Sequence, residues 1–368
     1  MLYTLDERAP VSYLTRGYDP AGGDWYDQCV YDVAGPKDVP TLRARLLAGW
    51  QPGAPYHLTA VNALMRTPDG RTTPYSPAFD STALARASLW WVTAEMTELV
   101  ERAALSLPPT TLTDELVAEP WGLVAFERPL VGSDAQTGEP ILVHAILWGI
   151  TTFTGDDGPR VGPLDRPREV WRPNEQCCLT IACYGRLAID EHGRHLGTTR
   201  GGANLGPWVP EGRTDWVWGQ DTASPSVEGF DEIHRTSMEE ERRWLASLWL
   251  LAAQRRLTDE TTVRRPRAER RRHERELPGR PELTNPAVRC VDVRRPEPPA
   301  HEAEHGRAVN WSRRWIVEGH WRQQAYGPGW SLRRPLFIGE FVKGPADRPL
   351  VLKETVNVLR TSPGERSE

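Results

Sequence analysis

The segment from Trp311 to Lys343, WSRRWIVEGHWRQQAYGPGWSLRRPLFIGEFVK, constrains the fold of this 368-residue chain more than any other. Residue character alternates on both sides of a Gly-Pro-Gly turn, which is typical of a β-hairpin. Trp315, Val317 and Trp321 fall on one face of the first strand, and Arg and His residues fall on the other. The pattern predicts a half-buried antiparallel ribbon.

Two further strands extend this prediction. Leu336, Ile338 and Val342 mark the second strand, and residues 350–359 mark a third. Together they predict a small C-terminal antiparallel β module over 309–360, followed by a disordered tail at 361–368. Because three strands of this size are marginal alone, we expect the module to cover another surface.

The N-terminal part predicts strands and helices in alternation. Residues 122–127 and 140–148 form two strand candidates around the turn-rich GSDAQTGE, which indicates a hairpin, and 178–189 is a third strand. Asp80 or Ser81 can cap a helix that runs to Leu105 with apolar residues at helical spacing.

A second main helix begins near Ser237, where Glu240 completes a capping-box pattern. We therefore predict an α+β fold, with a mixed or antiparallel sheet flanked by two main helices in a domain over 1–262. Residues 263–308 are rich in Arg and Pro and predict a linker, apart from a short strand at 287–293.

Charge restricts the classes of partner. Lys and Arg together number 45 against 50 Asp and Glu, so the formal net charge is −5 and no global positive field attracts polyanions. Nearly all of the basic residues are arginine, which is typical of a GC-rich coding sequence. Any nucleic-acid contact must therefore come from a local patch.

The sequence also predicts the compartment. The N-terminus lacks the basic and apolar pattern of a secretory signal, and the apolar run at 244–253 covers only half of a bilayer. The five cysteines include adjacent Cys177 and Cys178, which favours reduced thiols. We expect a cytoplasmic protein without a membrane partner.

The C-terminal ribbon combines cations for phosphates with flat rings for base stacking. The candidate DNA- or RNA-binding residues are Arg314, His320, Arg322, Tyr326, Trp330, Arg333, Arg334 and Lys343. The alternative is structural: tryptophans in a core and charges on a solvated sheet face. A second basic segment, 264–275, is interrupted by glutamates, so a solvated linker competes there with a phosphate-binding tail.

Catalytic motifs are sparse. The sequence has no GxGxxG, GxxxxGK(S/T) or GxSxG motif, and its one HExxH string, HEAEH at 301–305, falls in the predicted linker. We therefore assign no catalytic residue, metal or cofactor. Glu127 and His144 could face each other across the predicted hairpin, and His320 has charged neighbours, so an enzyme using either histidine stays a third hypothesis.

Four segments carry a resemblance to a protein family: PWGLVAFERPL, EPILVHAILWG, SMEEERRWLASLWLLAAQ and the C-terminal ribbon. The most specific pattern is G-H-W-R-x-Q at 319–324, followed by Y-G-P-G and by K-G-P at 343–345. From Pro120 onward the chain resembles a group of uncharacterised proteins from high-GC bacteria and their phages and plasmids. The resemblance implies a mobile-element context but no reaction and no site residues.

These observations predict a non-enzymatic accessory protein that binds nucleic acid or a nucleoprotein through the basic and aromatic C-terminal ribbon. The alternative is a protein-interaction or structural component whose C-terminal module is a docking surface anchored by tryptophans.

Overall fold

The computed structural model describes two compact units, 1–295 and 296–368, which we treat separately. The residues it describes are 33–49, 64–66, 72–74, 78–133, 140–154, 158–160, 175–186, 208–224, 232–264, 266–268, 271, 275, 287–294, 312–345 and 348–351. Within those ranges, no helix combines the length and the apolar character that a membrane crossing requires.

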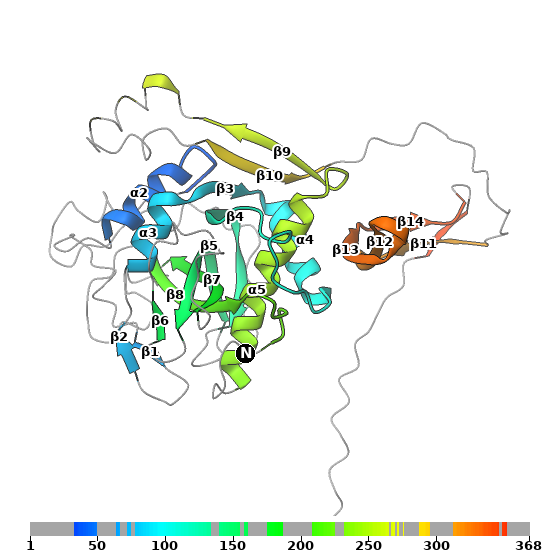
Figure 1. The fold of residues 1–368 in the computed structure, drawn as a ribbon. Helices are drawn as coiled ribbons and strands as arrows, with labels where there is room; N and C mark the ends of the chain where they lie inside the picture. The colour runs from blue at the N-terminus through cyan, green and yellow to red at the C-terminus, as the bar shows by residue number, and fades with distance from the viewer. Residues whose placement is uncertain are drawn as a thin grey trace, which may run out of the picture. The chain divides into compact units, whose positions relative to one another are not determined.

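A mixed eight-stranded sheet forms the first unit, with its strands in the order β8-β7-β5-β4-β3-β10-β9 and β6 beside β5 (Figure 1). The strands are β3 Ser88–Val92, β4 Trp121–Ser133, β5 Pro140–Thr154, β6 Gly158–Arg160, β7 Glu175–Arg186, β8 Trp208–Val217, β9 Thr258–Val263 and β10 Val288–Val293. Strand β3 is parallel to both β4 and β10, and the other pairs are antiparallel. The predicted α+β fold with a mixed sheet is confirmed.

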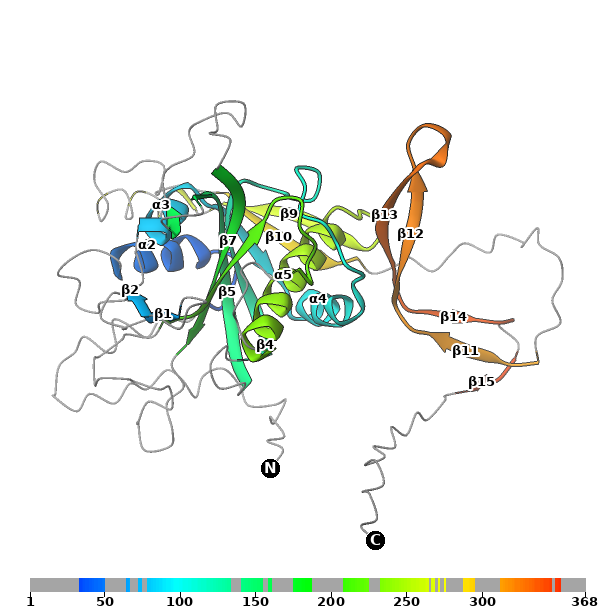
Figure 2. The ribbon, with the colours of Figure 1, turned by 60° about the horizontal axis from the view of Figure 1, so that its bottom comes forward.

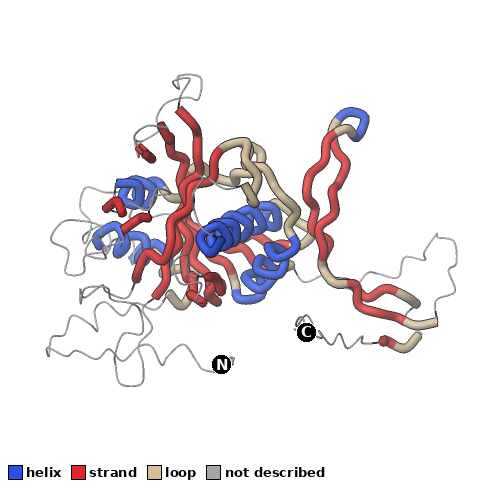
Figure 3. The backbone as a smooth tube through the Cα atoms, turned by 90° about the horizontal axis from the view of Figure 1, so that it is seen from below, coloured by secondary structure: helices blue, strands red, loops and turns tan. Residues whose placement is uncertain are grey.

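Helices cover both faces of this sheet (Figures 2 and 3). Helices α2 Val39–Gly49 and α3 Ala78–Arg86 lie on one face, and α4 Ala94–Ser106 and α5 Glu232–Ala252 lie on the other. A short hairpin, β1 Leu64–Arg66 and β2 Thr72–Pro74, completes the described elements of this unit. Under α2 and α3, Leu42, Phe79 and Leu84 pack on sheet residues such as Trp91 and Leu147 to form a buried core.

Tryptophan rings packed on glycines fix the β4–β5 pairing. Gly122 stands opposite Trp148, and Trp121 stands opposite Gly149, so each cross-strand pair joins one indole to one residue without a side chain. A Cβ added at Gly122 would lie 2.0 Å from Trp148 Cζ2. The absence of a side chain lets the large ring lie flat on the neighbouring strand. This arrangement confirms the predicted hairpin, with strands longer than expected.

The predicted helix from Asp80 to Leu105 is instead two helices, α3 and α4, separated by strand β3. The segment SLWWV at 88–92 is buried along almost its whole length. A strand covered on both faces has no polar alternation, so its apolar residues also match a helical spacing. Burial in the tertiary structure, and not the local sequence pattern, makes residues 88–92 a strand instead of a helix.

Helix α5 also differs in detail from its prediction. It begins at Glu232, and Ser237 is a buried residue within it rather than its N-cap. The apolar stripe of this helix is confirmed, because Leu245, Leu248 and Trp249 are all buried.

The predicted linker contains part of the main sheet. The short strand expected at 287–293 is present as β10, and it lies between β3 and β9 with an antiparallel pairing to β9. The first compact unit, which includes β10, runs to residue 295. Parts of the linker, the predicted strand beyond Val351 and the tail at 361–368 lie outside the described residues.

The second unit is a bent antiparallel ribbon (Figure 2). Its elements are β11 Arg314–Val317, β12 His320–Tyr326, the 3-10 turn η4 Pro328–Trp330, β13 Leu332–Ile338, β14 Phe341–Lys343 and β15 Leu350–Val351. Val317 faces Phe341 and His320 faces Ile338, so the register is the same on both sides of the bend. The predicted hairpin is confirmed, but the third strand, β15, pairs parallel to β11 and not antiparallel as predicted.

We expect Gly122→Ala to destabilise the first unit by about 1–3 kcal/mol, because the new methyl group must displace a buried indole. Trp148 cannot move aside easily, since it is fully buried and its Nε1 donates to the Glu119 carbonyl at 2.9 Å. Urea denaturation of the full chain measures the change. Gly35→Ala is the matched control, because nothing lies within 4 Å of an added Cβ there; equal stability of both variants would contradict the packing argument.

Candidate nucleic-acid interface

The strands β12 and β13 form a two-faced ribbon. Residues directly opposite each other share a face. One face carries the pairs His320–Ile338, Arg322–Leu336, Gln324–Arg334 and Tyr326–Leu332, and the other carries Trp321–Phe337, Gln323–Pro335 and Ala325–Arg333. The alternation predicted from the sequence is therefore present.

The Trp321 face holds the ribbon together. The rings of Trp321 and Phe337 meet edge to face with centroids 5.1 Å apart, and Phe337 is buried. The Phe337 ring lies against Gly319, where an added Cβ would be 2.7 Å from it. The small residue at the start of β12 thus allows the aromatic pair to close.

Arginines remain exposed on both faces. Arg322, Arg333 and Arg334 are exposed, and no carboxylate of the described residues forms an ion pair with any of them. The guanidinium of Arg334 lies 5.3 Å from the ring centroid of Tyr326. This cation–π contact holds Arg334 against the sheet but also covers one face of the tyrosine.

The remaining predicted cations lie beyond the bend. Arg314 donates from Nε to the Arg348 carbonyl at 2.8 Å, and Lys343 Nζ lies 6.0 Å from the centroid of Trp315. The exposed His320 has Nδ1 3.0 Å from the carbonyl oxygen of Glu318. The eight predicted residues thus spread over both faces and the tip of the ribbon rather than forming one cluster.

Trp330 is the last residue of η4, and η4 is the helical turn at the tip of the hairpin (Figure 3). Its side chain is 66% exposed, and its backbone has φ +58°, the left-handed region that bulky residues avoid. This backbone conformation costs a non-glycine residue about 1–2 kcal/mol. Gly327 and Gly329 adopt positive φ in the same turn without that cost.

The charge of the ribbon differs in sign from that of the whole chain. Residues 311–351 contain seven Lys and Arg against three Asp and Glu, although the chain carries a formal −5. The rest of the sequence is therefore more acidic than the total indicates. A local positive surface on an acidic protein matches the patch that the sequence argument required.

Sequence reasoning missed a set of exposed apolar side chains near β11. They are Ile316, Phe341, Val342, Leu350 and Val351, each 39–51% exposed. Their alternation indicates strands but does not reveal whether anything covers them.

Polar residues gather at the carboxyl ends of the parallel strands in the first unit, but they bond to each other. Thr93 donates to Asp292 at 2.7 Å, and the Ala94 N–H at the start of α4 donates to Glu127 at 2.8 Å. Glu127 thus caps helix α4.

His144 has its Nδ1 3.2 Å from the Leu142 carbonyl oxygen. Among the described residues, no group of three His, Cys, Asp or Glu could hold a metal ion.

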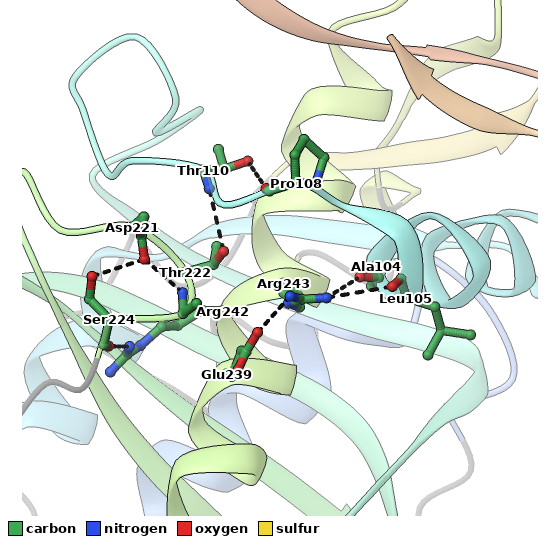
Figure 4. A network of polar contacts seen from close by, with 11 residues as sticks. Ala104, Leu105, Pro108, Thr110, Asp221, Thr222, Ser224, Glu239, Arg242 and Arg243 are labelled. Carbon is green, nitrogen blue, oxygen red and sulfur yellow. Dashed lines mark hydrogen bonds and ion pairs between the residues drawn. The ribbon is translucent and has the colours of Figure 1, made fainter. Parts of the chain in front are cut away.

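A second polar network joins α5 to its surroundings (Figure 4). Arg242 donates to the carbonyl oxygens of Ser224 and Asp215, while Arg243 pairs with Glu239 at 2.6 Å and points toward the end of α4. The bonds run mainly to backbone carbonyls, which favours a structural role.

Glu241, beside this network, is a buried titratable group. Burial raises its pKa to about 7, while hydrogen bonds with Thr214 and Cys183 and the charge of Arg242 oppose that shift. Its Oε2 has no hydrogen-bond partner among the described residues. A buried carboxylate with one oxygen lacking a hydrogen bond raises the free energy of the folded state when it is ionised.

Comparison with known proteins gives no match to a family model, a curated protein or a solved structure. The resemblance to proteins of high-GC bacteria and their phages and plasmids therefore stays a prediction.

We expect the stability of the protein to fall as the pH rises through about 7, because Glu241 must ionise in the folded core. The pKa of the folded state lies above the unfolded value of 4.5, so the favourable contribution is complete only below about pH 4.5. In Glu241→Gln, the difference in unfolding free energy between about pH 5 and pH 8 should shrink by about 3 kcal/mol.

Chemical denaturation across that pH range measures the effect. The control is Glu232→Gln, which alters an exposed glutamate of the same helix and should keep the pH dependence of the unaltered chain. An unaltered pH profile in Glu241→Gln would show that the Glu241 carboxylate is better solvated than its burial indicates.

Proposed function

We propose that this protein binds nucleic acid through its C-terminal ribbon and carries out no chemistry on it. The observation that carries the proposal is the set of exposed arginines, Arg322, Arg333 and Arg334, on a narrow ribbon that ends in an exposed tryptophan. Guanidinium groups bind phosphates and guanine edges in a bidentate way, and aromatic rings stack on bases.

The shape of the ribbon is compatible with this ligand. A two-stranded antiparallel ribbon is narrow enough to enter the major groove, which is about 12 Å wide. Arg322 and Arg334 lie on the same face of the ribbon. They belong to two different cross-strand pairs that are adjacent along that face. Two cations on one face can contact successive phosphates or bases along a strand.

The local charge of the ribbon also favours a polyanion as its ligand. The described carboxylates leave these arginines unpaired, so their charge is available to a polyanion. Because the chain as a whole is acidic, attraction operates only near the ribbon.

We expect the double variant Arg322→Gln with Arg334→Gln to bind DNA or RNA more weakly and with a flatter salt dependence. Each lost phosphate contact lowers the slope of log affinity against log salt by about 0.9 on duplex DNA. Fluorescence anisotropy of the full chain at several salt concentrations measures both quantities.

Arg256→Gln is the matched control, since Arg256 is an exposed arginine of the first unit. It should keep both the affinity and the slope of the unaltered chain. If the double variant behaves like this control, or if the unaltered chain binds no nucleic acid, the ribbon is not the interface we propose.

A second candidate function, self-association, is supported by the apolar side chains near β11. Ile316 and Val342 face each other on β11 and β14 and are 39% and 51% exposed. Phe337 is the one buried apolar residue among the described residues of the ribbon, so the ribbon lacks a substantial core of its own. A second copy could cover the same side chains symmetrically.

For this second candidate we expect a concentration-dependent dimer that Val342→Glu dissociates, because the new charge would be buried in the interface. Sedimentation velocity of the full chain measures the oligomeric state. Leu105→Glu, at a position 83% exposed on α4, should leave the dimer intact. A monomer at all concentrations would reject self-association and leave nucleic-acid binding unaffected.

A further inference from the structure

We infer that Trp330 is a base-stacking residue, and that the ribbon therefore selects nucleic acid with unpaired bases over continuous duplex. This inference rests on the proposed function and names its substrate class. The backbone and exposure of the hairpin tip carry it.

The turn holds Trp330 in an unfavourable conformation without burying it. Its φ of +58° is the one positive value at a non-glycine position in the described part of the chain. Burial gives little reason for a bulky residue at this place, because Trp330 is 66% exposed. A glycine or asparagine would fit the same backbone with less strain. Strain retained at an exposed aromatic residue is consistent with selection for contact with a ligand.

Hydrogen bonds fix the tip in this state. The Trp330 N–H donates to the Gly327 carbonyl at 3.2 Å, and the Ser331 hydroxyl donates to the Pro328 carbonyl at 3.0 Å. Arg333 donates from Nη1 to the Trp330 carbonyl at 3.0 Å. The indole is thus presented on an ordered turn, so that less conformational entropy is lost when a base stacks on it.

The tryptophan, tyrosine and phenylalanine rings of β12 and β13 are less available for stacking. The Arg334 guanidinium lies over Tyr326, and Trp321 and Phe337 pack on each other. Tyr326, Trp321 and Phe337 are all at least half-buried. Among the tryptophan, tyrosine and phenylalanine rings of β12, η4 and β13, Trp330 is therefore the one that offers an open face to a base.

A single projecting ring favours an unpaired base as its partner. In a continuous duplex, each internal base already stacks on two neighbours, so insertion of the indole requires unstacking. An unpaired base can swing out and stack on the ring without that cost, as in proteins that bind single strands. The arginines on both faces of the ribbon can hold the flanking phosphates.

The test uses the full-length chain and two labelled DNA probes, a continuous duplex and the same duplex with a run of unpaired bases at its centre. We expect the probe with unpaired bases to bind roughly tenfold more tightly, within the range measured for stacking of one base. Trp330→Ala should remove most of that preference. Trp330→Phe should retain much of it, because a phenyl ring also stacks.

The arginine variants provide the matched comparison. Arg322→Gln with Arg334→Gln should weaken binding to both probes by a similar factor and leave their ratio unchanged, because phosphate contacts do not depend on base pairing. The two sets of variants thus separate electrostatic attachment from base stacking.

Trp330→Gly distinguishes a ligand contact from a folding contact. Glycine accepts the left-handed backbone, so the hairpin should exchange its amide hydrogens no faster than in the unaltered chain. The same variant should lose the preference for unpaired bases. Faster exchange throughout β12 and β13 would assign Trp330 a folding role and overturn the inference.

The outcomes separate the two proposals. Equal affinity for both probes, or a preference that survives Trp330→Ala, would overturn base stacking while leaving binding by the ribbon in place. Failure of the unaltered chain to bind either probe or a single strand would reject nucleic-acid binding itself, and the stacking inference with it.

Discussion

The first unit depends on the packing of Trp148 on Gly122 across the β4–β5 pair. The Trp148 ring also meets Trp90 and Trp249 edge to face, at centroid distances of 6.0 and 5.5 Å. One side chain therefore connects strands β3, β4 and β5 to helix α5. A one-residue slip of the register would direct the indole to the opposite face of the sheet and break these contacts together. The register is fixed by this shape fit more than by hydrogen bonds, which a shifted ladder could also form.

Local patterns predicted those elements whose partners are near in sequence. The hairpin of β4 and β5 was predictable because alternation and turn residues both lie within one segment. Strand β3 was not, since Trp90 and Trp91 are buried on opposite faces and leave no alternation to detect. The parallel pairing of β3 with β10 joins segments nearly 200 residues apart, as the bond from Thr93 to Asp292 illustrates. No local signal specifies such a pairing, and the polar sequence before β10 indicated a linker instead.

The candidate interface was predictable to a similar degree. Alternation correctly placed Arg322 and Trp321 on opposite faces of the ribbon. It could not show that Arg334 would cover Tyr326, because that contact depends on rotamers across a diagonal pair. Nor could it show the backbone of Trp330, because positive φ is favoured at glycine and the turn contains two glycines that also adopt it. Turn sequences indicate where φ can be positive, but hydrogen bonds within the turn decide which residue takes it.

The charge distribution makes the strained tip more significant for the proposed binding. An acidic chain with one basic ribbon gains little long-range attraction to a polyanion, because physiological salt screens charges beyond about 8 Å. Few arginines are available there, so counterion release can supply only a modest, salt-sensitive affinity. A short-range contact that does not depend on salt would then account for a larger share of the binding free energy. Stacking on an exposed, pre-ordered indole is such a contact, and it gives a physical reason to keep tryptophan where glycine would fold more easily.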